Sequence, residues 1–123
     1  MIALSVGGIT LLAGCGGPTP DFEGPSGVRV INDHNESHTA RITVETDGRT
    51  VFDRRISVDG QSSTTIPEQM PGRKLLGRRT YTVSAELETG VSTTREFEYD
   101  GMHRFVLRIE EDGSLELSTY EPV

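Results

Sequence analysis

The side chains best suited to chemistry lie in the polar segment NDHNESH, residues 32–38. His34 and His38, with Asp33 and Glu36, would present two imidazoles and two carboxylates if this segment folded back on itself, and such ligands suit zinc, copper or nickel. Four ligands rarely come from one flexible heptapeptide, however, and Asn, Asp and Ser are the usual turn-forming residues. We therefore expect a solvated turn without a metal. The alternative is a metal- or solute-binding loop in which His34 and His38 are the candidate ligands.

The same segment contains Asn35-Glu36-Ser37, which matches the sequon for N-glycosylation. A turn between two strands would leave Asn35 accessible in an exported protein. Asn35 is therefore a candidate glycosylation site.

Two pairs of glutamates, Glu86/Glu88 and Glu96/Glu98, have the spacing that places both side chains on one face of a strand. Such pairs could bind calcium or act in glycoside hydrolysis. The same spacing is typical of the solvated face of a sheet, where charges prevent pairing with other chains. We favour the solvated face.

A group of basic residues could meet acidic partners or lipid head groups, or it could balance the many carboxylates. Charge balance is the interpretation that we favour. The group consists of Arg54, Arg55, Arg73, Lys74, Arg78 and Arg79.

Composition limits the classes of function. The chain has 123 residues, 19 acidic against 12 basic side chains and a net charge of −7. The acidic balance disfavours binding to nucleic acid, and the length fits one domain with one core. No nucleophile-elbow motif is present, and the size leaves little room for an enclosed pocket. We expect a protein that is not an enzyme and that needs no cofactor.

The lone cysteine, Cys15, follows an uncharged and mostly apolar stretch, residues 1–14, which is too short to span a bilayer. The stretch Leu12-Ala13-Gly14-Cys15 resembles the lipobox of lipoprotein signal peptides. That resemblance implies that residues 1–14 are removed and that Cys15 carries a lipid that anchors the chain to the outer face of the cell membrane. One departure is the lack of Lys or Arg before Cys15. The alternative is a buried cysteine beside an N-terminal strand.

Residues 16–26, GGPTPDFEGPS, contain three Gly and three Pro. We expect a flexible tether over residues 15–26, because this density of Gly and Pro disfavours regular structure. The alternative is an arm that packs on the domain through Phe22.

From Gly27 onward the apolar residues alternate with polar ones, which predicts strands with one buried and one solvated face. The cleanest example is YTVSAELE, residues 81–88, and Asp-Gly turns separate several such segments. The pattern predicts an all-β protein, a single antiparallel sandwich of about seven or eight strands over residues 27–120. Residues 68–78 lack the pattern and are expected to form a long connection from one sheet to the other, with Leu75 and Leu76 capping the core.

This part of the chain resembles the small immunoglobulin-like domains of surface lipoproteins from halophilic archaea. The resemblance is carried by ARITVE, TVFDRRISVDG, TYTVSAELETG and FVLRIEEDGSLELS, and by the acidic, Lys-poor composition. It implies a membrane-anchored extracytoplasmic sandwich and supplies no catalytic residues. We therefore expect a non-enzymatic binding or structural role in the cell envelope, with an unidentified envelope protein as a candidate partner. The alternative is a metal- or solute-binding accessory protein that uses the 32–38 loop.

Overall fold

The computed structural model describes residues 21–74, 77–98 and 104–119, and these segments contain strands but no helix. Accordingly, no described helix has the length and apolarity that crossing a bilayer requires. The strands are β2 (Asp21–Asn32), β3 (His38–Thr46), β4 (Arg49–Val58), β5 (Ser62–Lys74), β6 (Thr80–Leu87), β7 (Ser92–Glu98), β8 (Phe105–Ile109) and β9 (Leu115–Ser118).

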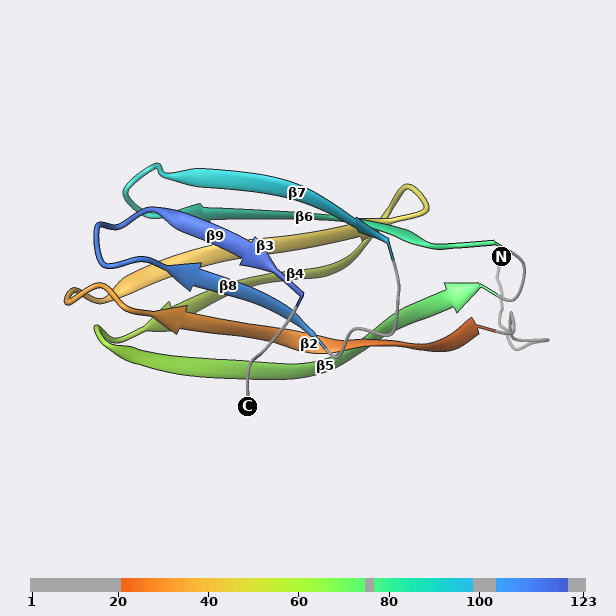
Figure 1. Ribbon diagram of the computed structural model, residues 1–123, viewed down its shortest axis with the longest axis horizontal. Coiled ribbons are helices and arrows are strands. Elements are labelled where there is room, and N and C mark those ends of the chain that lie inside the picture. The colour runs from red at the N-terminus through yellow and green to blue at the C-terminus, as the bar shows by residue number, and fades with distance from the viewer. Residues whose placement is uncertain (1–20, 75–76, 99–103, 120–123) are drawn as a thin grey trace, which may run out of the picture.

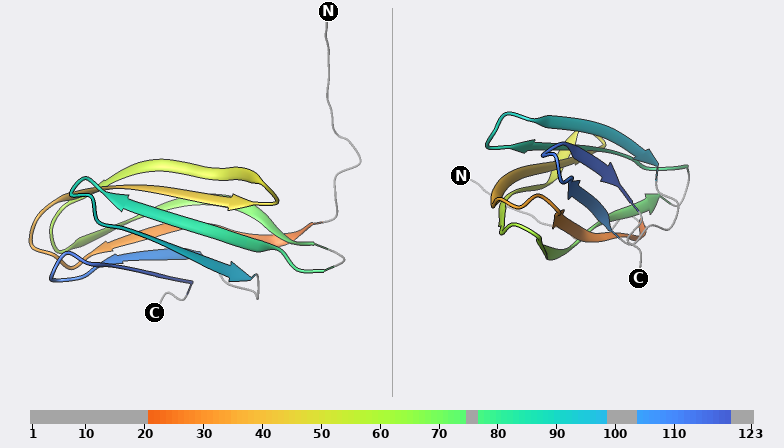
Figure 2. Two further views of the ribbon diagram at one scale, coloured as in Figure 1. Left: turned by 90° about the horizontal axis from the view of Figure 1, so that it is seen from above. Right: turned by 60° about the vertical axis from the view of Figure 1, so that its left-hand side comes forward.

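The strands form two four-stranded sheets, one in the order β5-β2-β8-β9 and the other in the order β4-β3-β6-β7. Figures 1 and 2 show the sheets as two stacked layers. Their facing sides bury the apolar residues of the alternating pattern, among them Val30, Ile42, Tyr81 and Leu107, all 0% exposed. The predicted all-β sandwich is thus confirmed, and its arrangement is compatible with an immunoglobulin-like domain.

Two of the Asp-Gly turns, at 47–48 and 112–113, and a Thr-Gly turn at 89–90 connect antiparallel neighbours in one sheet. Asp47 and Gly48 both have positive φ, 54° and 73°, as expected for the two-residue turn that matches strand twist. The Asp59-Gly60 turn differs, because it connects β4 to β5 in the opposite sheet. A Cβ on Gly60 would lie 2.5 Å from the carbonyl oxygen of Asn35, so this crossing turn needs a glycine.

One pairing departs from the expected antiparallel arrangement. β2 pairs with β8 in parallel, with Val30 opposite Leu107. The remaining pairings are antiparallel. Alternation shows which residues are buried but not which strands are neighbours, so this parallel pair could not be predicted from it.

The first strand begins earlier than the predicted domain boundary at Gly27. β2 starts at Asp21, and Gly24 and Pro25 within it are buried, so the tether prediction is wrong for residues 21–26. This segment pairs with the second half of β5 through several register shifts, which accommodate its Gly and Pro residues. Gln69 reinforces the pairing, because its Nε2 donates to the carbonyl of Gly24 at 2.8 Å.

The connection predicted for residues 68–78 is also wrong for most of its length. β5 continues through Pro67 and Pro71 to Lys74, because it is an edge strand whose prolines need not donate to a second neighbour. The predicted passage from one sheet to the other does follow, between β5 and β6. Leu75 and Leu76, proposed to cap the core, lie outside the described residues.

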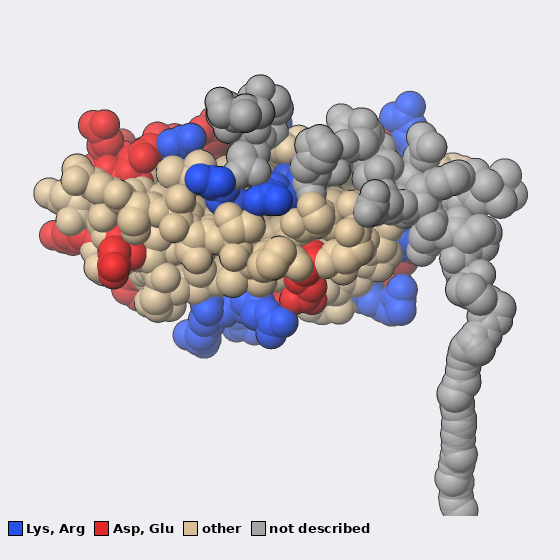
Figure 3. Space-filling view, turned by 90° about the horizontal axis from the view of Figure 1, so that it is seen from below, with Lys and Arg blue, Asp and Glu red and all other residues tan. Residues whose placement is uncertain are grey.

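The sandwich has two distinct ends. The "loop end" contains segments 33–37, 59–61, 88–91 and 110–114, and the "N-terminal end" contains the start of β2, the turn at 47–48 and the start of β6. Figure 3 shows carboxylates gathered toward the loop end of the face in view, with Lys and Arg over the middle and the N-terminal end. The acidic residues of the loop end are Asp33, Glu36, Asp59, Glu88, Glu110, Glu111 and Asp112.

Candidate functional site

Asn32, the last residue of β2, holds the predicted loop in place. Its side chain is 0% exposed. Nδ2 lies 2.8 Å from the carbonyl oxygen of Glu36, 3.3 Å from that of Val58 and 3.1 Å from that of Asp59. Its Oδ1 accepts the backbone N–H of His34 at 3.0 Å. One buried amide therefore connects the loop after β2 to the end of β4 in the other sheet.

A chain of three titratable side chains runs through the same end of the molecule. His34 Nδ1 lies 2.8 Å from His38 Nε2, and His38 Nδ1 lies 2.8 Å from Oε2 of Glu88. The ring planes of the histidines are inclined by 28° and their centroids are 5.0 Å apart. Because the nitrogens are much closer than the centroids, the rings meet edge to edge, as in an N–H···N hydrogen bond. The His38 side chain is 4% exposed, whereas that of Glu88 is 46% exposed.

Glu88 determines which ring nitrogen of His38 carries a proton. Its Oε1 also accepts the backbone N–H of Thr39 at 2.6 Å. This bond first, and then the bond from His38, holds the pKa of Glu88 below its usual range, so the side chain is a carboxylate at neutral pH. A carboxylate only accepts hydrogen bonds, so Nδ1 of His38 carries a proton. The sequence placed Glu88 merely on the solvated face; its position just after a strand end was the available signal.

The four ligands considered for a metal are not brought together. Asp33 binds Arg108 at 2.6 Å instead, and Glu36 is exposed. His34 and His38 direct their nitrogens at each other at hydrogen-bond distance, which leaves no space for an ion between them. In the described segments no cluster of three or more His, Cys, Asp or Glu side chains has a metal-binding arrangement.

A shallow depression lies beside His34 at the loop end. It is lined by Asp33, His34, Asn35, Gln61 and Glu111. The backbone N–H of Gln61 donates to the carbonyl of His34 at 2.9 Å and so joins the β4–β5 turn to the loop. Polar and acidic groups make this surface suitable for water and for cationic groups.

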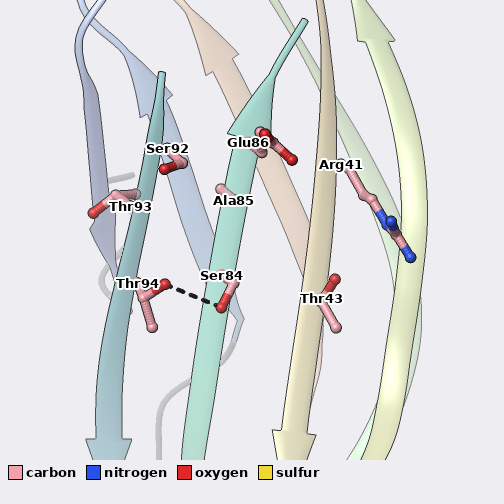
Figure 4. Close-up of a pocket in the computed structure, with 8 residues that line it drawn as sticks. All are labelled: Arg41, Thr43, Ser84, Ala85, Glu86, Ser92, Thr93 and Thr94. Atoms are coloured by element: carbon pink, nitrogen blue, oxygen red, sulfur yellow. Dashed lines mark hydrogen bonds between the residues drawn. The ribbon is translucent and has the colours of Figure 1, made fainter. Parts of the chain in front are cut away.

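A second hollow lies on the outer face of the β4-β3-β6-β7 sheet (Figure 4). Its walls are polar, and Ser84 and Thr94 share a hydrogen bond of 3.2 Å across β6 and β7. Arg41 points away from this bond toward β4, where its guanidinium binds Asp53 at 3.1 Å. That contact, mainly through its hydrogen bonds, lowers the pKa of Asp53. The full lining is Arg41, Thr43, Ser84, Ala85, Glu86, Ser92, Thr93 and Thr94.

The predicted glutamate pairs do not form acid–base pairs. Glu88 is bound to His38 and Thr39, whereas Glu86 lies opposite Arg41 in the register of β6 and β3. Glu98 forms an ion pair with Arg78 at 2.7 Å. Glu86, Glu96 and Glu98 are thus exposed residues of a solvated sheet face, whereas Glu88 lies in the turn after β6.

Several cations of the predicted basic group are balanced by carboxylates. Arg54 binds Glu68 at 2.8 Å, and Arg79 binds Asp47 at 2.8 Å. Arg79 is buried and its Nε also donates to the carbonyl of Gly72 in the opposite sheet. The pairs are those expected for charge balance.

The remaining predicted positions are Asn35 and Cys15. Asn35 is exposed in the loop after β2, so its side chain is accessible. Cys15, predicted to carry a lipid, lies outside the described residues.

Comparison with known proteins adds no assignment. No model of a known protein family matches the chain, and no curated protein is significantly similar to it.

Proposed function

We propose that this protein is a lipoprotein held at the extracytoplasmic face of the cell membrane by a lipid on Cys15, with a non-enzymatic binding or structural role in the envelope. One observation carries the proposal: an uncharged apolar segment is followed directly by Leu12-Ala13-Gly14-Cys15. The acidic, Lys-poor composition and the segments that resemble surface domains of halophilic archaea agree with it.

If Cys15 carries a lipid, the start of β2 limits the distance between the sandwich and the membrane. Six residue steps separate Cys15 from Asp21, a span of at most about 20 Å. The N-terminal end of the sandwich would therefore stay close to the lipid surface. β2 has 12 residues, so the loop end would lie about 40 Å farther out.

A surface role is also supported by the polar character of the residues that line the two hollows. The exposed loop end is then the part of the domain most accessible to a partner. The acidic residues there favour a partner with a basic surface.

The test is the intact mass of the full chain recovered from the membrane of a lipoprotein-processing host, beside a Cys15→Ser variant. The expected mass is that of residues 15–123 plus lipid, with the variant uncleaved or released from the membrane. An Asn35→Gln variant separates added glycan mass from lipid mass. A chain that retains residues 1–14 and carries no lipid contradicts the proposal.

A further inference from the structure

We propose that the paired histidines of the 32–38 loop form a pH-sensitive latch at the loop end. The latch is closed while His34 and His38 together carry no extra proton or one, and it opens when both rings are protonated. The inference depends on the contacts of the loop end and not on the lipid anchor.

The closed state accepts either of two proton arrangements. Glu88 keeps a proton on Nδ1 of His38, whose ring is almost completely buried. With both rings neutral, Nδ1–H of His34 donates to Nε2 of His38 across the 2.8 Å contact. With one added proton, Nε2 of His38 donates to Nδ1 of His34 instead. The hydrogen bond persists in both cases.

A second added proton removes the acceptor. Both facing nitrogens then carry hydrogen, so the 2.8 Å contact becomes a repulsion between two cations. His38 is held from the other side by Glu88 and is buried, whereas the His34 ring is only partly buried. His34 is therefore the ring that must leave.

Carboxylates lie on the segments next to His34, and two of them, Asp33 and Glu111, line the depression beside its ring. Its own loop supplies Glu36 and Asp33, the latter paired with Arg108 of β8. The β4–β5 turn supplies Asp59, and the β8–β9 turn supplies Glu111 and Asp112. Interaction with His34 contributes to the lowered pKa of Asp112, after the hydrogen bonds from Ser114.

On the far side of the pair, Glu88 borders a hollow that Arg41, Arg55 and Glu86 also line. Arg41 and Arg55 thus lie on the Glu88 side of the pair, whereas the carboxylates of Asp33 and Glu111 line the depression beside His34. The field around the pair therefore draws a doubly protonated His34 outward, toward solvent and the β8–β9 turn.

Movement of His34 is transmitted to the neighbouring turn. The backbone carbonyl of His34 accepts the N–H of Gln61. The backbone N–H of His34 donates to Oδ1 of Asn32. Opening the latch loosens segments 33–37 and 59–61, which line the depression beside His34. Asn32 keeps its bonds to Val58 and Asp59, so the sandwich itself stays folded.

The test uses nuclear magnetic resonance on the full chain between about pH 8 and pH 4, the range in which histidines titrate. The ring signals report proton uptake, and the amide exchange of Gln61 reports opening. Because the two rings share one hydrogen bond, proton uptake is expected in two coupled steps. Exchange at Gln61 should rise about ten-fold or more through the second step, after correction for the intrinsic pH dependence of exchange.

A His34→Gln variant should take up one proton at His38 and show no acid-induced rise at Gln61. Glu45→Gln changes an exposed carboxylate of β3 away from the loop end and should retain both steps. The proposal is overturned if the two rings titrate independently, or if Gln61 exchange is unchanged by acid. It is also overturned if equimolar Zn²⁺ binds at neutral pH and His34→Gln abolishes the binding, because the pair is then a metal site.

Discussion

Each end of the sandwich is closed by a buried polar side chain that reaches from one sheet to the other. At the N-terminal end, Arg79 precedes β6 and contacts Gly72 in β5 and Asp47 in the turn between β3 and β4. At the loop end, Asn32 of β2 binds the last residues of β4. The N-terminal tie depends on a permanent charge, and the loop-end tie on a neutral amide.

The difference extends to their surroundings. Around Arg79 the contacts are an arginine–carboxylate pair, a threonine hydroxyl on the carbonyl of Thr80, and the Tyr81 hydroxyl on the carbonyl of Pro71. Around Asn32 the neighbours include two histidines, and the carboxylates of Asp33 and Glu111 line the depression beside His34. The N-terminal end therefore keeps its hydrogen bonds and its ion pair across the neutral and mildly acidic range. The hydrogen bonds of the loop end can change with pH.

The largest effect is expected from Arg79→Met. Its side chain is 3% exposed, and removing it leaves Asp47 and the Gly72 carbonyl without this donor. We expect the free energy of unfolding to fall by about 3 kcal/mol, since Asp47 is partly solvated. Chemical denaturation at about pH 8 and pH 5.5 should give equal losses, because no histidine takes part.

The adjacent Arg78→Met is the control for this change. Arg78 is 73% exposed in its pair with Glu98, so its loss should change stability by less than about 0.5 kcal/mol. Equal losses for both variants would show that Arg79 does not tie the sheets together.

Asn32→Ala should have the next largest effect. Three carbonyl oxygens lose the Nδ2 donor, two of them at the end of β4. We expect a loss of about 2 kcal/mol in the free energy of unfolding and faster amide exchange in the loop. Asn35→Ala, in the same loop but exposed, should match the parent protein within about 0.5 kcal/mol. A fully stable Asn32→Ala would show that Asn32 does not tie the two sheets together at the loop end.

Glu88→Gln should show that the loop end responds to acid. Its pKa is lowered in the folded state, so its stabilisation is complete above the ordinary value for a glutamate and is lost as pH falls through the lower folded value. With the side chain 46% exposed, we expect a loss of about 1 kcal/mol at neutral pH. The difference should shrink as pH falls below the ordinary range of a glutamate, because a protonated Glu88 is uncharged, as Gln is.

Glu86→Gln is the matched control for Glu88→Gln, because Glu86 is an exposed carboxylate of β6 only two residues before Glu88. Unfolding curves at several pH values should show little change for it. A Glu88→Gln deficit that stays constant down to the acidic limit would mean that packing, not charge, fixes Glu88.

The contacts at the loop end also show which features of the structure could be predicted from the sequence. The sequence analysis assigned Asn32 to the polar segment 32–38, whereas its side chain is buried and bonds to the end of β4, which lies in the other sheet. The spacing of His34 and His38 indicated proximity, yet their partner Glu88 is 50 residues from His38 in sequence. Local patterns predicted the strands, the core and three hairpin turns. They did not predict the parallel β2–β8 pair or the strands through Gly- and Pro-rich segments, because pairing supplied by distant residues decides these features.

The smallest predicted effect concerns repulsion at the loop end. The pKa of Glu110 is raised, first by desolvation and then by the nearby carboxylate of Glu116, with Asp33 adding to the effect. A raised folded pKa means that ionisation of Glu110 costs stability, so the cost is absent in acid and is present once pH exceeds the folded value. Glu110→Gln should therefore raise the free energy of unfolding by roughly 0.5 kcal/mol at neutral pH, and by less in concentrated salt. The exposed neighbour variant Glu111→Gln separates this local effect from a general reduction of net charge. If both variants stabilise the protein equally, the loop end differs from the N-terminal end only in its total charge; if Glu110→Gln alone does, the specific contact with Glu116 makes the loop end sensitive to pH.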